Sequence, residues 1–119
     1  MDWTMDKSRP IYPQICEQLC LRIAQRMFAP HQKLLSVREI AVELGVNPNT
    51  VQHSLEALEH NGILYSIRGS GWYVAENVDL AKNVLQSILA QKTADYFAAM
   101  ALLGMDEAAV KEYVKEWRV

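Results

Sequence analysis

Apolar residues recur at helical spacing in the first part of the chain. Ile15, Leu19 and Ile23 lie four residues apart, which places them on one face of a helix. The pattern opens after the extended run Pro10-Ile11-Tyr12-Pro13. We expect Ala29-Pro30 to end it, because proline cannot continue the hydrogen-bond ladder of a helix. The first predicted element is therefore an amphipathic helix between these two runs.

Two further helices are predicted with a very short connection between them. Ser36-Val37-Arg38-Glu39 has the residue order of a capping box. Gly45 stands where a helix ends in a left-handed residue. Asn47-Pro48 then supplies an N-cap and a proline at the first helical position. Because only Val46 separates the two signals, the helices must cross steeply, as in a helix-turn-helix.

A strand pattern follows the third helix, which is expected to end near Asn61-Gly62. Residues 63–67 form a short apolar run, Arg68-Gly69-Ser70-Gly71 has the composition of a turn, and residues 72–74 return as a second strand. The expected fold is therefore mainly α: a winged helix-turn-helix of three helices and a β-hairpin, followed by a two-helix tail.

From residue 76 onward the apolar pattern is purely helical. Gly104 interrupts it, and Asp106 is a suitable N-cap for a last short helix. Two helices alone bury this much apolar surface poorly, so a second copy of the chain is the expected partner. We predict a winged-helix domain over residues 1–75 and a dimerisation tail over residues 76–119. The residues expected at the dimer interface are Leu85, Ile88, Leu89, Phe97, Met100, Val110, Val114 and Trp117.

Composition supports a folded chain and leaves the partner open. Half of the 119 residues are apolar and 22% are charged, which fits one compact domain with a short appendage. No apolar run approaches the roughly 18 residues that span a bilayer, and the first residues lack a signal-peptide pattern. We therefore expect a cytoplasmic protein without a membrane partner.

The distribution of charge changes the picture more than its sum. The net charge is −2, yet residues 7–72 hold seven Lys or Arg against five Asp or Glu, and residues 73–119 hold five against seven. A weakly basic front is compatible with phosphate contacts but does not demonstrate them, since phosphate binding depends on where the cations are placed.

No residue pattern points to an enzyme or to a bound cofactor. Cys16 and Cys20 lie inside a helical apolar pattern and are expected to be reduced, buried thiols, with a redox switch or metal site as the alternative. Zinc needs further ligands, and His31, His53 and His60 have no ligand spacing with the cysteines. A nucleophile–base set, a phosphate loop and a metal cluster are all missing from the sequence pattern.

The chain resembles the GntR family of transcription regulators. The resemblance is carried by residues 36–41, 44–51, 58–62 and 69–71. The short tail is similar to that of its YtrA subfamily. The resemblance covers roughly residues 8–75 and implies a dimer that binds a near-palindromic operator and usually represses transcription. YtrA-like members are often linked with transporter operons.

The resemblance also implies which residues touch DNA. Ala29-Pro30-His31 and Leu34-Leu35-Ser36 depart from the family pattern, because the loop glycine and one proline are missing. Pro48 replaces a residue that is basic in many longer-tailed relatives, and Trp72-Tyr73 replaces Thr-aromatic in the wing. The resemblance implies DNA contact for Arg38, Asn47, Asn49, Thr50, Gln52, Arg68 and Gly69, and we include Ser36 and the outward-facing His53 in the expected interface.

The residue types themselves suit the reading of DNA. Asn49 and Gln52 carry paired donors and acceptors that match adenine better than guanine in the major groove. The alternative is that both are simply solvated helix residues. Arg38 is placed to reach a phosphate or a guanine edge. Arg68, flanked by glycine at the wing tip, is expected to enter a narrow, A·T-rich minor groove.

One rival function stays open on the sequence alone. A winged helix can serve as a protein-interaction module without binding DNA, but such modules generally have apolar groups where this chain has Asn47-Pro48-Asn49-Thr50. An unidentified small-molecule effector would have to bind at the interdomain joint or between paired tails.

Overall fold

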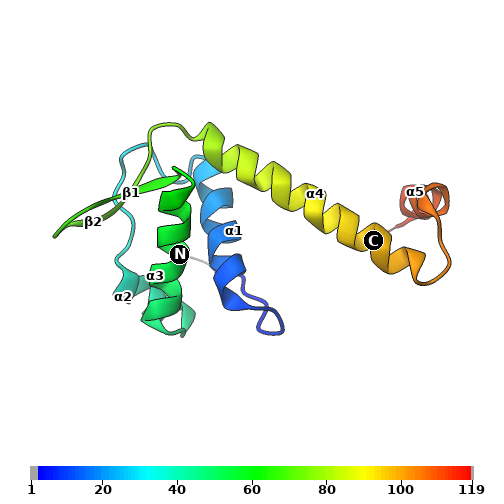
Figure 1. The fold of residues 1–119 in the computed structure, drawn as a ribbon, viewed down its shortest axis with the longest axis horizontal. Helices are drawn as coiled ribbons and strands as arrows, with labels where there is room; N and C mark the ends of the chain where they lie inside the picture. The colour runs from blue at the N-terminus through cyan, green and yellow to red at the C-terminus, as the bar shows by residue number, and fades with distance from the viewer. Residues whose placement is uncertain (1–2, 119) are drawn as a thin grey trace. The chain divides into compact units, whose positions relative to one another are not determined.

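The structure is a computed structural model that describes residues 3–118. The chain divides into two compact units, Met1–Leu85 and Gln86–Val119 (the amino-terminal and carboxy-terminal units below). Its elements confirm the predicted three helices, hairpin and two-helix tail (Figure 1). In chain order they are α1 (Ile11–Ala24), α2 (Val37–Leu44), α3 (Pro48–His60), β1 (Leu64–Ile67), β2 (Gly71–Val74), α4 (Asp79–Ala101) and α5 (Glu107–Glu116).

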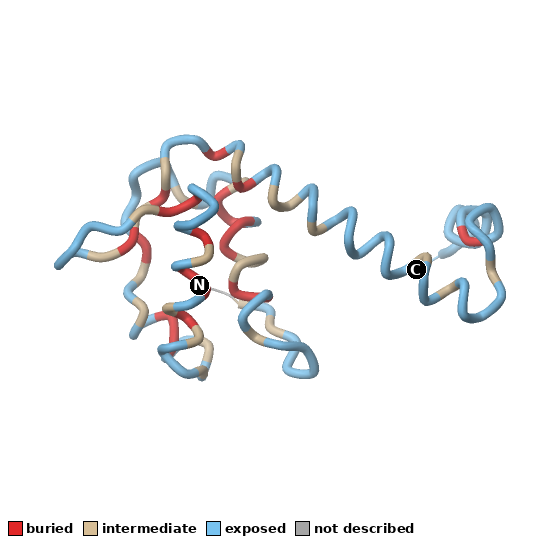
Figure 2. Tube along the Cα trace, viewed as in Figure 1, coloured by how far each residue is buried: buried red, intermediate tan, exposed pale blue. Residues whose placement is uncertain are grey.

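The core of the amino-terminal unit lies mainly between α1 and α3, which pack against each other. The predicted apolar face of α1 is buried, and Val51, Leu55 and Leu58 meet it from α3. Leu64 and Val74 close the core from the two strands, and Figure 2 shows the buried positions gathered along these elements. The core leaves the opposite face of α3 free to meet another molecule.

The first helix ends at Ala24, earlier than the expected stop at Ala29-Pro30. Arg26 adopts a left-handed conformation with φ +59°. Its backbone N–H donates to the carbonyl of Ile23 at 3.0 Å, and that of Met27 donates to the carbonyl of Arg22 at 2.9 Å. This is the hydrogen-bond pattern of a Schellman motif, formed here by an arginine in the place usually taken by glycine.

Strands β1 and β2 form an antiparallel hairpin in which Leu64 pairs with Val74 and Ser66 pairs with Trp72. The loop before α2 runs along the outer edge of β2. There the Leu34 N–H donates to the Trp72 carbonyl at 2.8 Å, and the Val74 N–H donates to the Gln32 carbonyl at 2.9 Å. The hairpin is therefore anchored to the helical core through this loop.

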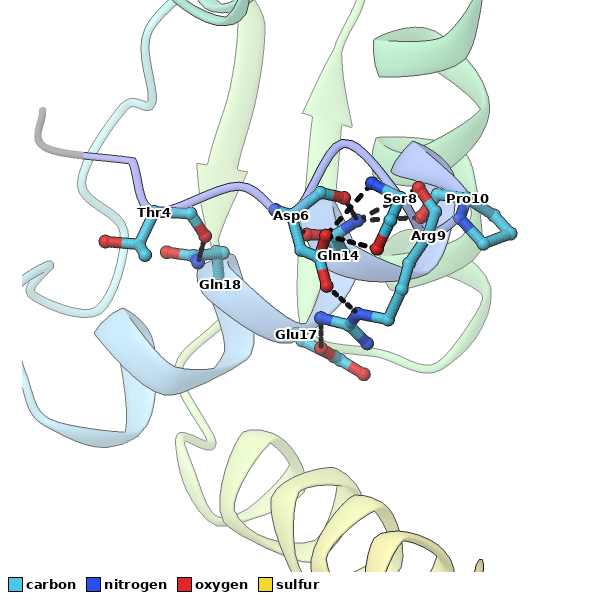
Figure 3. Close-up of polar contacts among 8 residues, drawn as sticks. All are labelled: Thr4, Asp6, Ser8, Arg9, Pro10, Gln14, Glu17 and Gln18. Carbon is cyan, nitrogen blue, oxygen red and sulfur yellow. Dashed lines mark hydrogen bonds and ion pairs between the residues drawn. The ribbon is translucent and has the colours of Figure 1, made fainter.

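The segment before α1 is held by the buried amide of Gln14 (Figure 3). The Gln14 Oε1 accepts from the Asp6 N–H at 2.6 Å, and its Nε2 donates to the Asp6 carbonyl at 2.7 Å. The Asp6 carboxylate in turn accepts from the N–H and hydroxyl of Ser8. The bonds from Ser8, first from its hydroxyl and then from its N–H, lower the pKa of Asp6. Together with the Gln14 bonds they fix the chain as it enters α1.

The carboxy-terminal unit contains most of α4 together with α5. The predicted N-cap Asp106 is confirmed, since its Oδ1 accepts from the Ala109 N–H at 2.9 Å. Val110 is fully buried within the single chain. In contrast, most other side chains of this unit are exposed, including several large apolar ones.

Candidate nucleic-acid interface

The amino end of α2 is fixed by the predicted capping box. The Ser36 Oγ accepts from the Glu39 N–H at 3.1 Å, and the Glu39 carboxylate accepts from the Ser36 N–H at 3.0 Å. Hydrogen bonding of the Glu39 carboxylate to Ser36, first to its backbone N–H and then to its side chain, lowers the pKa of Glu39. Arg38 lies exposed in this first turn, where its side chain is available to a phosphate.

The turn between α2 and α3 is built as the sequence predicts. Gly45 has φ +67°, a left-handed conformation that suits glycine. The side chain of Asn47 then accepts from the Asn49 N–H at 2.8 Å and caps α3. Asn47 therefore fixes the start of α3 through its side-chain oxygen.

The outer face of α3 is polar. Asn49 and His53 are exposed, while Gln52 is half-buried. The Gln52 Nε2 donates to the Glu56 Oε1 at 2.9 Å across one helical turn. Since the amide nitrogen carries two hydrogens, this bond leaves the Gln52 oxygen and one N–H for a further partner.

Ser54 links α3 to α1. Thr50 is half-buried, and its carbonyl accepts from the buried Ser54 hydroxyl at 2.9 Å. The Ser54 carbonyl lies 3.6 Å from the Cys16 sulfur of α1.

The two cysteines of α1 have raised pKa values. Burial raises the pKa of the Cys16 thiol. Burial, together with the nearby Cys16, raises the pKa of Cys20 to about 12. Both thiols are therefore protonated at neutral pH.

The wing tip is polar and open. Arg68, Gly69 and Ser70 are exposed in the turn between the strands. Tyr65 and Tyr73, paired on one face of the hairpin, stack with ring centroids 5.5 Å apart. The tip is therefore presented by a hairpin whose base is rigidified by aromatic packing.

His31 takes the place of the missing loop glycine and adopts its left-handed backbone, with φ +66°. Its Nδ1 shares a 2.8 Å hydrogen bond with the Tyr65 hydroxyl. Its Nε2 lies 3.7 Å from a carboxylate oxygen of Glu76. The departure from the family pattern thus adds a contact between the loop and the wing.

A groove runs between α3 and the wing. It brings together three of the expected DNA contacts, namely Gln52, Arg68 and Gly69. The other expected DNA contacts lie outside the lining of this groove, on α2 and α3 or at their caps. They are Ser36, Arg38, Asn47, Asn49, Thr50 and His53.

Two groove residues, Glu56 and Glu59, were missed at the level of the sequence. The sequence could have indicated Glu56, because it stands four residues after Gln52 and residues at that spacing are neighbours on a helix. Glu59 bonds to Ser66 of β1. That contact depends on how the hairpin packs, so no local pattern announces it.

The expected dimer residues have different surroundings in the single chain. Leu85, Ile88, Phe97 and Met100 are half-buried, whereas Leu89, Val114 and Trp117 are 50–58% exposed. Val110 is buried by its own chain, so its direct role is to pack the carboxy-terminal unit. A hollow in this unit has a mostly apolar lining, made by Tyr96, Met100, Leu103, Met105, Tyr113, Val114 and Trp117.

The described residues also limit the kind of site. Within residues 3–118, no three His, Cys, Asp or Glu side chains gather as metal ligands. Over the same residues, no helix is both long and apolar enough to cross a membrane.

Comparison with known proteins decides the family. The family model described as bacterial regulatory proteins, gntR family, matches residues 11–74. The chain belongs to the GntR family. The transcriptional repressor YtrA of Bacillus subtilis is 34% identical over 114 residues, which cover 92% of this chain and 85% of YtrA.

Solved structures agree with this GntR assignment. A GntR family transcriptional regulator from Listeria monocytogenes superposes with a TM-score of 0.78 at 34% identity, over 96% of this chain and 100% of that chain. The DNA-binding domain of AraR in complex with operator ORE1 gives a TM-score of 0.55 at 28% identity, over 63% of this chain and 94% of that chain. This GntR protein is thus a DNA-binding transcription regulator and not an enzyme.

Proposed function

We propose that the protein represses transcription by binding a near-palindromic operator as a homodimer. The observation that carries the proposal is the outer face of α3. Its amino end is capped by Asn47 and presents the polar side chains of Asn49, Gln52 and His53, while its other face is buried in the core. Because its proposed partner is duplex DNA, the protein acts in the cytoplasm, and a transporter operon is a candidate target.

Each part of the winged helix has a distinct task in this proposal. The amino end of α3 enters the major groove, where the amides of Asn49 and Gln52 match the donor–acceptor pair of adenine. Arg38, in the first turn of α2, neutralises a backbone phosphate. Arg68 on the wing enters the neighbouring minor groove and favours a narrow A·T-rich flank.

The carboxy-terminal unit supports the homodimer. Leu102 and Leu103 are 89% and 78% exposed in the single chain, and Trp117 is 58% exposed. Apolar exposure of this kind is typical of a protein–protein interface. We propose that a second copy of the chain covers these side chains and the adjacent hollow. A two-fold dimer presents two copies of α3, which matches an operator of two inverted half-sites.

Selection of the full-length protein against a random pool of duplex DNA tests the proposal. We expect an enriched inverted repeat with A·T-rich flanks. Folded, dimeric protein that enriches no sequence would show that the protein alone does not bind an operator, and that binding needs an effector or that the winged helix serves a protein partner. The enriched operator is then placed over a promoter, where added protein should lower transcription. A rise in transcription would instead identify an activator.

A further inference from the structure

Glu59, near the carboxyl end of α3, reaches across to the hairpin. Its Oε2 accepts hydrogen bonds from the Ser66 N–H at 3.0 Å and from the Ser66 hydroxyl at 2.7 Å. Hydrogen bonds to an ionised acceptor are shorter and stronger than those between neutral groups. One carboxylate oxygen therefore links α3 to β1.

This contact gives a hydrogen-bond partner to a backbone N–H on the outer edge of β1. A two-stranded sheet leaves unpaired backbone groups along both edges. The outer edge of β2 is bonded to the loop before α2, through Leu34 and Gln32. On β1, the Ser66 N–H points to Glu59. Both outer edges of the hairpin therefore make hydrogen bonds to the rest of the unit, β2 to the loop before α2 and β1 to Glu59 of α3.

The Glu59–Ser66 contact lies at the point along the hairpin where the apolar core ends. Along β1, burial falls from Leu64, which is in the core, to Ile67, which is 46% exposed. Trp72, which pairs with Ser66 from β2, is the buried side chain of the hairpin nearest the turn. Arg68 follows Ser66 by two positions. The Glu59–Ser66 contact is therefore placed to set the direction in which the wing tip projects.

We propose that Glu59 is a positioning residue, which orients the wing so that Arg68 reaches the minor groove while α3 occupies the major groove. The inference rests on the proposed operator contact of Arg68. Glu59 then influences the preference for flanking sequence, which Arg68 reads, and leaves the choice of bases read by α3 unchanged.

Two substitutions separate the hydrogen bonds of Glu59 from its charge. Glu59→Gln and Glu59→Ala both remove a negative charge that faces DNA, so both should raise general DNA affinity to a similar extent. Glu59→Gln keeps an oxygen that can accept from Ser66, whereas Glu59→Ala does not. Any difference between the two variants therefore reports on the hydrogen bonds.

The experiment measures binding of the full-length protein to duplexes that share the operator core and differ only in A·T-rich or G·C-rich flanks. Each variant is combined with Arg68→Ala. We expect Arg68→Ala to reduce the flank preference about fivefold in the wild-type and Glu59→Gln backgrounds, and less than about twofold in Glu59→Ala, which has already lost that preference. Core-base preference should stay the same in all variants.

Each alternative result overturns the proposal in a different way. A Glu59→Ala protein with full flank preference would show that the wing is oriented without Glu59, leaving the Arg68 contact intact. A Glu59→Gln protein that behaves like Glu59→Ala would assign the effect to charge. An Arg68→Ala protein with unchanged flank preference would remove the wing contact itself. If Glu59→Ala unfolds, Ser66→Ala, which removes only the shorter bond, replaces it and should lose part of the preference; full retention would again contradict the proposal.

Discussion

At the scale of single residues, the chemistry of the interface depends on how side chains on α3 hold one another. Gln52 donates one N–H to Glu56 and keeps an oxygen and a second N–H for a partner. That remaining pair matches the N6 and N7 positions of adenine and mismatches the two acceptors of guanine. The bond to Glu56 thus fixes the orientation of the Gln52 side chain, which would otherwise be free to rotate.

Gln52→Ala should weaken binding to the selected operator and relax the preference for adenine at one position of each half-site. A lost bidentate contact costs about 1–3 kcal/mol of discrimination. Competition binding against operators substituted at every position measures the change.

The chain offers a matched control for this substitution. Gln91 and Asp95 on α4 form the same kind of one-turn contact, at 2.8 Å between Nε2 and Oδ1. Gln91→Ala removes that contact without touching α3, so operator preference should not change. Unaltered base preference in Gln52→Ala at every position would refute the role of Gln52 in readout.

At the scale of elements, α2 and α3 owe their positions to their caps. Ser36 and Glu39 satisfy each other's backbone at the start of α2, and Asn47 does so at the start of α3. These signals involve residues within three positions of each other, which is why the sequence alone predicts them correctly. The end of α1 was predicted wrongly because Arg26, an unusual residue for a left-handed position, closes that helix.

The lowered pKa of Glu39 makes the capping box dependent on pH. An acid with a lowered folded-state pKa adds stability above its unfolded pKa of about 4.3, and this stability is lost as the pH falls through the folded value. Glu39→Gln should therefore be less stable than the wild type at neutral pH. The difference should vanish in acid, where the protonated glutamate and glutamine are nearly alike.

Urea unfolding of both proteins at about pH 7 and about pH 3 measures this difference. An acidic residue with a lowered pKa that is not coupled to Glu39, such as Asp6, titrates in both proteins and cancels in the comparison. A stability difference that stays constant or grows toward acid would contradict the assignment.

At the scale of the whole molecule, the carboxy-terminal unit exposes apolar surface that a second copy of the chain would bury. The amino-terminal unit encloses its own core, but Leu89 on α4 is 57% exposed and the apolar hollow beside α5 is open. These features support the proposed homodimer and, through its symmetry, the proposed inverted-repeat operator.

Sedimentation equilibrium at micromolar concentration should show a dimer. Leu89→Glu should shift it toward monomer, because an unpaired charge buried in an interface costs about 3 kcal/mol or more, roughly a hundredfold in the dissociation constant. Binding to the full operator should weaken in parallel.

Val42→Glu serves as the control for this change. Val42 is 77% exposed on α2, in the amino-terminal unit, so the same substitution there should leave the dimer intact. A wild-type protein that sediments as a monomer, or a Leu89→Glu protein that stays dimeric, would count against the interface.

The sequence by itself determined the features that arise between near neighbours: the caps of α2 and α3, the glycine turn between them, the polar face of α3 and the apolar excess of the tail. Such features depend on a few adjacent residues, and their physical causes act within one or two helical turns. Tertiary structure alone decided the contacts between elements. It bonded Glu59 to Ser66, set His31 against Tyr65 and buried Val110 within its own chain. These contacts form only after the chain has packed, because each joins side chains whose distance is fixed by the fold and not by their spacing along the sequence.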